Sequence, residues 1–576
     1  MKFLFENYPY REDLINGFVP EWMIRQSSDS NSVTLPFVGY TFLKKANEIV
    51  FFLPKIFVFE NGLAFGSITP EDLLSKNDLR QLNNELLSKR MYSLSLWIYE
   101  SIKKYRLTLK DNELNPFRTE LAKYIIDYKK GKFSHTIMEL YLGLIDFFRE
   151  NRNIFIRKKI DSSAGHNINW HRTVSRVSPF IQDEIPFYIT QQTKLSRIDF
   201  EEELLCIYFS VLNYFKTVYK CKIQIDPRYK ILRGHQFERF LDGKGIRLLN
   251  KLKGKYFSDT FVKLWKLLYD FFNYYSNISL SKDYEESLVT NNYPKVFESM
   301  VDSLIGDSTT EIPRYYKEQR DGKIVDHIYR DTDLFSKSEI YFIGDSKYYS
   351  IGRSATGESV SKQFTYAKNV IQYIINSELN GYSVHSQNKT RYRDELTEGY
   401  NITPNFFISA VIDKDYDAAR DNIQISGKPD FQCQFKNRLF DRDTLAIQRY
   451  SINFLFVLSA YISLDDYVKE SFKKRARKKF RKDIINYIND RYVLFKVYHN
   501  NESSNEKIVT RNFKQYSGQM YAFQDENRYI IIAFDIEYLK KQNDDCKNAD
   551  LKGFLKKELT DLPDVDHVEE FLLNQE

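Results

Sequence analysis

The chain has 576 residues and a formal net charge of +7, from 85 Lys and Arg against 78 Asp and Glu. Hydrophobic residues make up 42% of it, which excludes a disordered chain, and the length exceeds one ordinary core, so we expect two or more globular domains. The mild positive charge is compatible with a phosphate-rich partner but does not require one.

The first half of the chain divides into a strand-rich part and a mainly helical part. Residues 1–90 contain two runs rich in Val, Phe, Thr and Leu, at 32–42 and 49–59, which are typical of strands. Residues 91–285 repeat apolar side chains at helical spacing. The predicted helices there cover residues 91–106, 136–150 and 261–275. Residues 167–188 contain prolines and are expected to be irregular or extended.

Residues 286–576 show an informative order of elements. The predicted elements are a helix at 292–305, strands at 315–320, 323–330 and 338–348, a helix at 359–376 and a strand at 405–412. The first two strands flank Asp321-Gly322, a favoured hairpin turn. This order is α-β-β-β-α-β. A buried helix at 452–462 and strands at 493–499 and 529–536 follow.

Two carboxylates and an amine are predicted to meet on one face of the strands. The sequence IVDHIYR places Asp326 inside one strand, and FIGDSKYY places Asp345 and Lys347 two residues apart on the next. Alternate residues of a strand share a face, so Asp345 and Lys347 point the same way, and Asp326 joins them if these strands are neighbours. The carboxylates can hold Mg²⁺, with Mn²⁺ as a substitute, and the lysine can orient or deprotonate a water. Phosphodiester hydrolysis needs this set of groups.

The residues next to this set leave two interpretations open. A cross-strand Asp/Lys pair at the surface is common and contributes little to stability. However, Asp345 and Lys347 end an apolar strand, where charged groups are costly unless they are paired or functional. The carbonyl of Ser346 could supply a further oxygen ligand to the metal. His327 alternates with Asp326, so we expect it on the opposite face of the sheet in a structural role.

At these residues the sequence resembles the PD-(D/E)XK nuclease superfamily. More narrowly, it is similar to the nuclease component of LlaJI-type restriction systems, which are relatives of the McrC subunit of McrBC. The segments that carry the resemblance are VDHIYRD (325–331), IGDSKYY (343–349), SVSKQFTYAKNVIQ (359–372) and RLFDRDTLAIQRYSINFLFVL (438–458). Residues 38–57 and 169–188 resemble these proteins more weakly. The resemblance implies an α+β multidomain protein, with a nuclease core and a C-terminal extension in residues 286–576.

The resemblance also assigns roles by position. It implies that Asp326 and Asp345 are metal ligands, that Lys347 is the catalytic lysine and that Glu298 is an accessory acid. The usual Pro-Asp of the motif is Val325-Asp326 here, a departure that weakens the motif match more than the chemistry. Glu298 lies off the apolar stripe of its predicted helix, so a plain solvated glutamate is the alternative for it.

The helix predicted at 359–376 carries a first candidate for DNA contact. Gln363 and Tyr366 lie three residues apart, on the face away from Phe364 and Ala367. Gln363 matches the glutamine that the superfamily carries on the corresponding helix. These two side chains could follow a DNA strand, or they could simply form an exposed polar face.

A basic run is the second candidate for DNA contact. KKRARKKFRK, residues 473–482, has eight basic residues in ten, and on a helix it leaves Ala476 and Phe480 as a narrow apolar anchor. Non-specific phosphate contact is one interpretation, and a solvated basic helix is the other. The candidate residues are Lys473, Lys474, Arg475, Arg477, Lys478 and Lys479.

A near-motif argues against nucleotide hydrolysis by the chain itself. GRSATGES, residues 352–359, has the glycine spacing of a P-loop, but Glu358 stands where the lysine must be, and a carboxylate there repels phosphate. Restriction systems of the resembled type pair their nuclease with a separate McrB-like AAA+ GTPase, and a cognate DNA methyltransferase can belong to the same system. By this analogy, residues 91–285 are expected to dock the partner.

The cysteines and apolar segments indicate a cytoplasmic protein that does not enter a membrane. Cys206, Cys221, Cys433 and Cys546 lie far apart without a CxxC pair, which predicts neither disulfides nor a zinc site. Charged residues come too early at the N-terminus for a secretory signal. The longest nearly apolar run, residues 452–464, is shorter than the roughly 20 residues that span a bilayer.

The acidic residues and the lysine predict a Mg²⁺-dependent nuclease. The resemblance implies that it is an endonuclease subunit that cuts double-stranded DNA in a restriction system, an antiviral defence, and that a separate GTPase drives it. One alternative is a stand-alone structure-selective or repair nuclease that uses the same metal site. Another is a non-catalytic scaffold with a degenerate nuclease fold, although the joint retention of Asp326, Asp345 and Lys347 argues against it.

Overall fold

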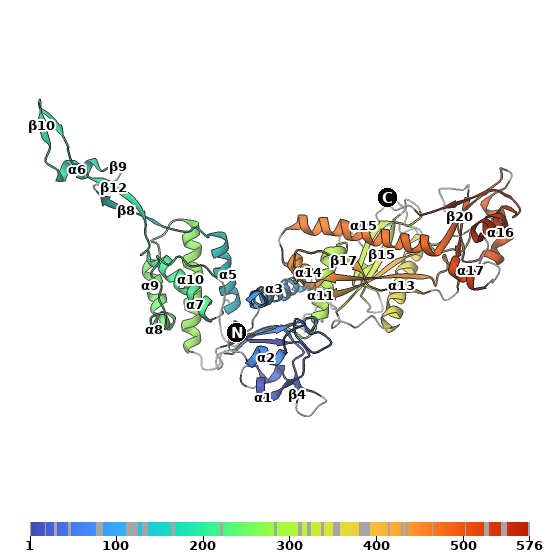
Figure 1. The fold of residues 1–576 in the computed structure, drawn as a ribbon, viewed down its shortest axis with the longest axis horizontal. Coiled ribbons are helices and arrows are strands. Elements are labelled where there is room, and N and C mark those ends of the chain that lie inside the picture. The colour runs from blue at the N-terminus through green and yellow to red at the C-terminus, as the bar shows by residue number, and fades with distance from the viewer. Residues whose placement is uncertain are drawn as a thin grey trace.

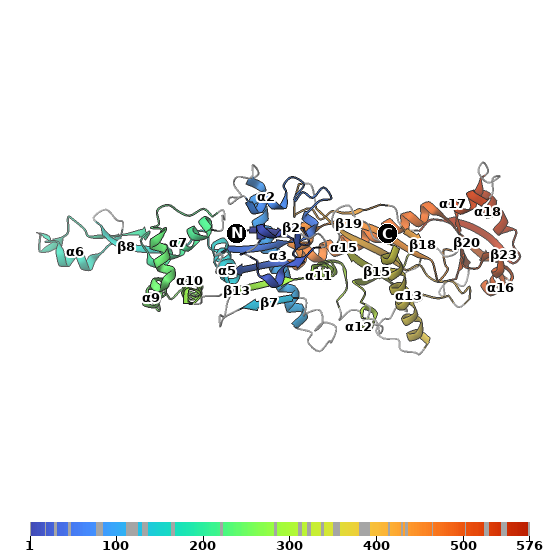
Figure 2. The same ribbon diagram turned by 90° about the horizontal axis from the view of Figure 1, so that it is seen from below.

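The structure of the chain is a computed structural model. It describes residues 2–573, except residues 16, 18, 28–31, 44–47, 76–84, 111–124, 130–135, 163–166, 219–222, 281–284, 309–313, 319–323, 336–338, 349–356, 380–391, 395, 413–414, 428–429, 433–435, 464, 502, 523–528 and 543–549. The protein is a mixed α/β structure with several sheets. It is elongated, with a thin arm at one end and the C-terminal elements at the other (Figures 1 and 2).

The N-terminal sheet combines strands from distant parts of the sequence. Its described strands, in spatial order, are β1 (Lys2–Phe5), β6 (Glu48–Leu53), β5 (Val38–Leu43), β13 (Glu285–Thr290) and β7 (Ile125–Lys129). The run at 32–42 forms β4 (Ser32–Thr34) and β5, as predicted. The run at 49–59 is a strand only as far as Leu53, where β6 ends, and Lys55–Phe57 form a 3₁₀ helix. β13 pairs antiparallel with both β5 and β7, so this sheet extends well beyond residues 1–90. Smaller elements beside it are β2 (Tyr10–Arg11), β3 (Arg25–Gln26), α1 (Glu12–Ile15) and α2 (Pro70–Ser75).

The middle of the chain contains the predicted helices. They are α3 (Glu85–Lys110), α5 (Ile137–Glu150) and α10 (Asp259–Leu280), and they are joined by α7 (Glu203–Val218), α8 (His235–Arg239) and α9 (Gly245–Leu252). Sequence signals explain the start of α5, because Thr136 and Glu139 form a reciprocal capping box. Except for α3, these helices form a bundle between the N-terminal sheet and the arm (Figure 1).

The arm shows that this region is less helical than predicted. It consists of β8 (Arg157–Ser162), β9 (Asn167–Ile168), α6 (Trp170–Arg176), the hairpin β10 (Phe180–Gln182) and β11 (Ile185–Phe187), and β12 (Thr193–Ile198). The hairpin turn places Asp183 and Glu184 at positive φ, as a two-residue turn of this kind requires. Residues 167–188 are therefore extended, as predicted, except for α6. The arm projects away from the bundle (Figure 1).

A second sheet occupies the other half of the molecule. The described elements around it are α11 (Tyr293–Ile305), β14 (His327–Thr332), β15 (Glu339–Lys347), α13 (Gly357–Leu379), β16 (Pro404–Val411), β17 (Ile423–Ile425), β18 (Asp430–Gln432) and β19 (Leu445–Asn453). The spatial order is β14-β15-β16-β19-β17, and β18 also pairs with β19. β14 is antiparallel to β15, whereas β15, β16 and β19 are parallel. We call this the β14–β19 sheet.

Two predictions at the start of this region are wrong. The start of the strand expected at 315–320 is instead a short helix, α12 (Arg314–Lys317), and the expected pairing is described only as one antiparallel bridge between Glu318 and Ile324. The next strand begins at His327, so Asp326 precedes it rather than lying inside it. Tyr316 of α12 is buried against the rings of Tyr341 and Tyr373, at 5.1 and 5.3 Å between centroids. This packing outweighs the local strand preference. The expected Asp321-Gly322 turn lies outside the described residues.

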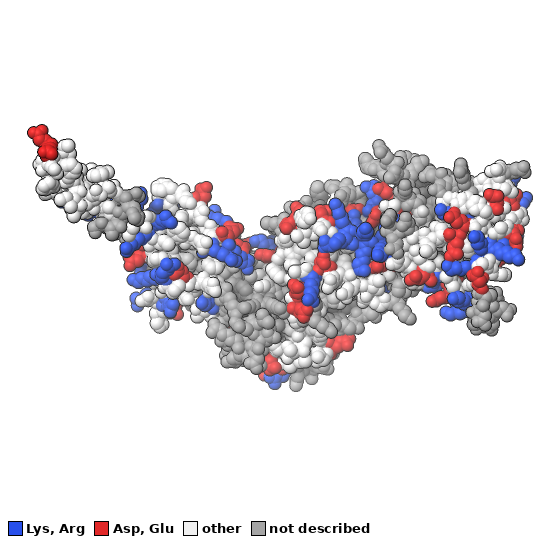
Figure 3. Space-filling view, turned by 45° about the horizontal axis from the view of Figure 1, so that its top comes forward, with Lys and Arg blue, Asp and Glu red and all other residues white. Residues whose placement is uncertain are grey.

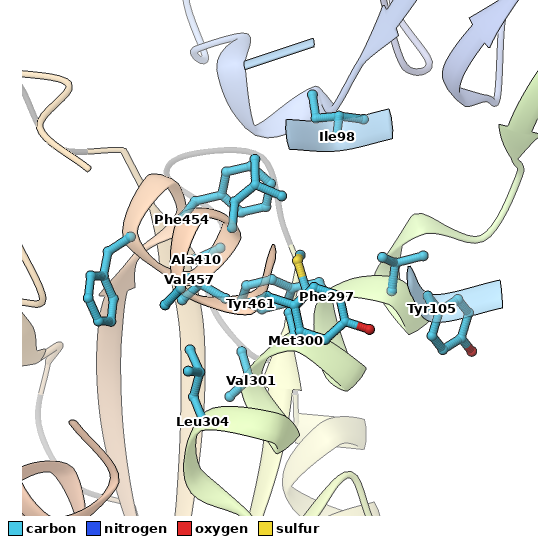
Figure 4. Close-up of a cluster of buried hydrophobic side chains, with 14 of the residues drawn as sticks. Ile98, Tyr105, Phe297, Met300, Val301, Leu304, Ala410, Phe454, Val457 and Tyr461 are labelled. Carbon is cyan, nitrogen blue, oxygen red and sulfur yellow. The ribbon is translucent and has the colours of Figure 1, made fainter. Parts of the chain in front are cut away.

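The N-terminal sheet and the β14–β19 sheet share one hydrophobic core. Figure 4 shows Ile98 and Tyr105 of α3 near Phe297 and Met300 of α11 and near α14 (Phe454–Ile462). The buried helix predicted at 452–462 is thus confirmed from residue 454 onward, and the two residues before it end β19. The helix that bears Glu298 is therefore packed from both halves of the molecule.

The C-terminal part contains a long helix and a separate sheet. α15 (Asp466–Arg491) leads into a sheet whose described strands are β21 (Met520–Tyr521), β22 (Tyr529–Asp535), β20 (Tyr492–His499) and β23 (Val565–Phe571). The predicted strands at 493–499 and 529–536 are confirmed. Flanking helices are α16 (Asn505–Tyr516), α17 (Ile536–Gln542) and α18 (Leu551–Thr560). Among all the helices that the structure describes, none has the length and apolar character to cross a membrane.

Candidate active site

The predicted catalytic residues lie where β14 begins and β15 ends. Asp345 and Lys347 are on β15, and Asp326 immediately precedes β14. The ladder between these strands ends at the pair His327 and Gly344, so the acids lie just past its last rung. A Cβ on Gly344 would meet the ring of Phe406 at about 2 Å, which explains the glycine at this position.

The structure brings together the four residues predicted to be catalytic. The Nζ of Lys347 contacts the Oδ2 of Asp345. The carboxyl of Asp345 in turn interacts with that of Asp326, whose Oδ2 accepts a hydrogen bond of 3.0 Å from the backbone N–H of Ser346. Glu298, on α11, lies beside Asp326 and exposes only a fifth of its side chain. The alternative of a plain solvated glutamate at Glu298 is therefore wrong.

Lys295 is a site residue that the sequence reasoning missed. Its Nζ contacts the Oε2 of Glu298 and lies 3.8 Å from the Oδ1 of Asp326. Burial tends to lower the pKa of this lysine, but the charges of Glu298 and Asp326 outweigh burial and raise it. The spacing of three residues between Lys295 and Glu298 on one helix was the available signal. The acids are thus flanked by a lysine on either side, Lys295 and Lys347.

The pKa values of Asp345 and Glu298 are raised because both carboxyls are buried close to Asp326. Burial, and then the charge of Asp326, raises the pKa of Asp345 from 3.8 to about 7, although Lys347 partly offsets this. Burial and Asp326 also raise the pKa of Glu298 well above its ordinary value, against the opposing effect of Lys295. Crowded carboxyls of this kind are typical of functional sites. A bound cation would remove the repulsion between them.

The donor set fits a hard divalent cation with few protein ligands. In the part of the chain that the structure describes, no group of three or more His, Cys, Asp or Glu side chains is arranged to hold a metal. The fit therefore depends on the adjacent carboxylates of Asp326 and Asp345. Mg²⁺ commonly binds through one or two carboxylates and keeps several waters, so two are sufficient.

The end of β15 is also fixed to the N-terminal sheet. Tyr348, which follows Lys347, is buried and donates a hydrogen bond of 2.7 Å from its hydroxyl to the Oε2 of Glu6. The backbone N–H of Lys55 donates to the same oxygen, at 3.2 Å. The position of Lys347 therefore depends on contacts with both halves of the molecule.

The two candidates on α13 have different surroundings. The side chain of Gln363 is buried, and its Nε2 donates to the carbonyl of Ile343 at 3.0 Å and to the Oδ1 of Asn405 at 2.9 Å. Gln363 therefore neither contacts DNA from the helix surface nor belongs to an exposed polar face, so both predictions for it are wrong. Its amide instead joins α13 to β15 and β16. Tyr366 is half-buried beside the acids, where burial, Asp326 and Asp345 raise its pKa.

The basic run lies on α15, but several of its charges are paired within the protein. Ala476 and Phe480 are buried, as predicted for the apolar anchor. Arg477 points inward and donates to the carbonyl of Ile305 at 2.9 and 2.6 Å, which makes it a link to α11 and not a surface group. Ion pairs within the chain also involve Lys473 with Glu470, Arg475 with Asp421 and Lys479 with Asp483.

Two residues of the predicted phosphate-binding set retain free charges. Lys474 and Lys478 are exposed, and neither has an ion-pair partner among the residues that the structure describes. Lys482 continues their spacing of four residues along the helix and is also exposed. Lysine and arginine side chains gather over this part of the surface (Figure 3).

The remaining predicted features are easily placed. His327 is fully buried beneath the acids, and its Nε2 shares a hydrogen bond of 2.6 Å with the hydroxyl of Ser346. The side chain of Ser346 thus faces His327, and the role of its carbonyl stays a prediction. Glu358 is exposed in the first turn of α13 and lies 3.3 Å from Lys362. Residues 352–356 of the P-loop-like segment lie outside the described residues.

Comparisons with family models, with curated proteins and with solved structures give no match for this chain.

Proposed function

We propose that the chain is a divalent-cation-dependent DNA endonuclease of the PD-(D/E)XK type. One observation carries this proposal: Asp326, Asp345 and Lys347 converge at the end of two paired strands, with Glu298 beside them on the preceding helix. The nearest non-catalytic explanation is a surface Asp/Lys pair. The burial of the acids and the raised pKa values of Asp345 and Glu298 argue against that explanation.

The order of elements around the site also supports the proposal. α11, β14, β15, α13 and β16 follow one another in the order that the superfamily resemblance implies, apart from the first strand, of which the described residues show only the bridge of Glu318 with Ile324. β15 and β16 are parallel and α13 connects them, which is the usual crossover between parallel strands. Both carboxylates and the lysine come from the antiparallel pair β14 and β15 or its edge.

In the proposed reaction, Asp326 and Asp345 would hold Mg²⁺, and the Ser346 carbonyl could be a further ligand. A cation bound there would polarise the phosphoryl oxygen and acidify a water. Lys347 lies beside Asp345 and partly buried, where its Nζ can orient the attacking water or accept its proton. Lys295 holds the carboxylates of Glu298 and Asp326 in place and supplies positive charge for a phosphate.

The substrate and partner parts of the proposal use surfaces away from the acids. Lys474 and Lys478 on α15 are free to contact DNA phosphates without reading sequence. The arm exposes apolar side chains at its tip, including Phe180, Ile181 and Ile185, which are 58%, 68% and 57% exposed. Exposed apolar clusters commonly mark protein interfaces. We assign this tip to the docking of a separate AAA+ GTPase in a restriction system.

The proposal is tested by restriction in cells that carry the native gene cluster, with phage plating as the readout. Asp326→Asn or Asp345→Asn should abolish restriction, whereas the matched control Asp331→Asn, on β14 but outside the acidic cluster, should retain it. Mn²⁺ binding by the purified variants should follow the same pattern. Full restriction by Asp345→Asn would place the active site elsewhere. Nucleotide-independent cutting of ordinary duplex by the isolated chain would instead favour a stand-alone nuclease.

A further inference from the structure

A hydrogen-bonded network of three side chains, Asp302, His327 and Ser346, lies directly beneath the carboxyls of the site. The Nδ1 of His327 lies 3.4 Å from the Oδ1 of Asp302, and its Nε2 lies 2.6 Å from the Oγ of Ser346. Lys317 of α12 contacts the other oxygen of Asp302. This network thus runs from α11 through β14 to β15, on the face of the sheet opposite the carboxyls of the site.

Each member is a neighbour of a proposed catalytic residue. Asp302 follows Glu298 by one helical turn, His327 follows Asp326 directly, and Ser346 lies between Asp345 and Lys347 on β15. The network therefore connects the backbone segments that carry all four proposed catalytic side chains.

The network lies where the backbone hydrogen bonds between β14 and β15 have ended. The register of β14 and β15 ends at His327 and Gly344, so no further rung between these strands holds residues 345–347. On that side two contacts replace the ladder: the Ser346 N–H donates to Asp326, and the Ser346 hydroxyl pairs with His327. The spacing between the carboxyls of Asp326 and Asp345 depends on these contacts.

The protonation state of Asp302 is consistent with a fixed geometry of the network. Burial alone would raise the pKa of Asp302, but Lys317 and His327 outweigh it and lower that pKa. An ionised carboxylate can only accept hydrogen bonds, so the Nδ1–H of His327 donates to Asp302. His327 is completely buried, and Ser346 nearly so, which keeps both side chains from touching a substrate.

We propose that Asp302, His327 and Ser346 are positioning residues that set the separation of the Asp326 and Asp345 carboxyls for cation binding. This inference rests on the proposed nuclease function. The network joins α11 to β14 and β15, so the positions of Glu298 and of the two aspartates relative to one another stay fixed. Partners that orient metal ligands from outside the coordination sphere typically contribute about 10–100-fold to metal affinity.

The decisive variant is Ser346→Ala, which removes one hydroxyl and leaves the backbone carbonyl and N–H in place. Its matched control is Ser287→Ala in the N-terminal sheet, where the Ser287 hydroxyl forms an equally buried hydrogen bond of 2.7 Å with Thr41. Both variants lose one buried hydroxyl pair, so a purely structural role predicts similar effects on thermal unfolding and no specific effect on cation binding.

Mn²⁺ affinity is measured on the purified full chain without DNA, by calorimetry and by the electron paramagnetic resonance of bound Mn²⁺. We expect Ser346→Ala to weaken Mn²⁺ binding about 10-fold or more and to change the spectrum, whereas Ser287→Ala changes neither. Ser346→Thr, which keeps the hydroxyl, should restore affinity to within about threefold of the original. If Ser346→Ala does not fold, Asp302→Asn is a second variant that disrupts the network.

The outcomes separate this inference from the proposed function. If Ser346→Ala and Asp302→Asn bind Mn²⁺ like Ser287→Ala while Asp345→Asn does not bind it, the positioning role is wrong and the nuclease site stands. If the unmodified chain does not bind Mn²⁺, or if Asp345→Asn binds it equally well, the proposed function itself is wrong.

Discussion

Asp345→Asn should stabilise the cation-free protein at alkaline pH, although it should abolish activity. The carboxyl of Asp345 is buried beside Asp326, and its pKa is raised from 3.8 to about 7. The folded state therefore holds a proton there that the unfolded chain releases at lower pH. Below about pH 4 the group is protonated in both states and has no effect. Between pH 4 and 7 the native state becomes progressively less favoured, and above pH 7 the penalty is constant.

The size of this effect follows from the pKa and from the structure. The rise from 3.8 to about 7 corresponds to a ceiling of about 4 kcal/mol, at about 1.4 kcal/mol for each pKa unit. Glu298 and Asp326 share the same repulsion, so part of this energy remains when one acid is removed. We expect Asp345→Asn to gain about 2 kcal/mol over the unmodified protein above pH 7, and nothing near pH 4.

The assay is thermal and urea unfolding in EDTA at pH 4.5 and pH 8.5, with Asp331→Asn as the control. The advantage of Asp345→Asn should be several times larger at pH 8.5 than at pH 4.5, and Mg²⁺ should reduce it by stabilising the unmodified protein. A variant that is less stable than the unmodified protein at pH 8.5 would refute the reasoning, because it would mean that the ion pair with Lys347 outweighs the repulsion. A gain of equal size at both pH values would refute it as well.

Three further predictions concern separate parts of the molecule. Lys347→Ala should lower the rate of cleavage by about 10²–10⁴ with an unchanged circular dichroism spectrum, and a loss below tenfold would remove the lysine from the reaction. The double variant Lys474→Ala with Lys478→Ala should reduce the slope of log affinity for DNA against log salt by about two units, and an unchanged slope would make this helix a solvated surface. Ile181→Asp with Ile185→Asp, at the tip of the arm, should prevent capture of the GTPase partner while Mn²⁺ binding persists, and normal capture would place the docking surface elsewhere.

The sequence was sufficient for most local elements, because apolar spacing encodes them directly. The helices around residues 137–150, 259–280 and 293–305 and the strand that carries Asp345 were all expected, since their apolar side chains repeat with the period of one buried face. The alternation of strand residues also placed Asp345 and Lys347 together correctly. Such features depend on neighbours within one element.

Features that depend on distant partners were not predictable in this way. β13 joins the N-terminal sheet from more than 200 residues away, and no local pattern indicates that pairing. Tyr316 has a strand-forming sequence around it, but the aromatic side chains of Tyr341 and Tyr373 hold it in a helical turn. In both cases the decisive contacts come from residues that are close only after folding.

The same reason explains the errors at the site. The sequence pattern placed Gln363 on the surface and gave Lys295 no role. Burying an amide or an ammonium group without partners costs several kcal/mol, so polar residues are expected at the surface. Folding supplies those partners: Asn405 and the carbonyl of Ile343 for the amide, and Glu298 with Asp326 for the lysine. A polar residue can therefore be assigned to the surface from sequence only if the fold provides no buried partner for it. A cluster of acids is the place where that assumption fails first, since repelling carboxyls stabilise any cation that folding brings near them.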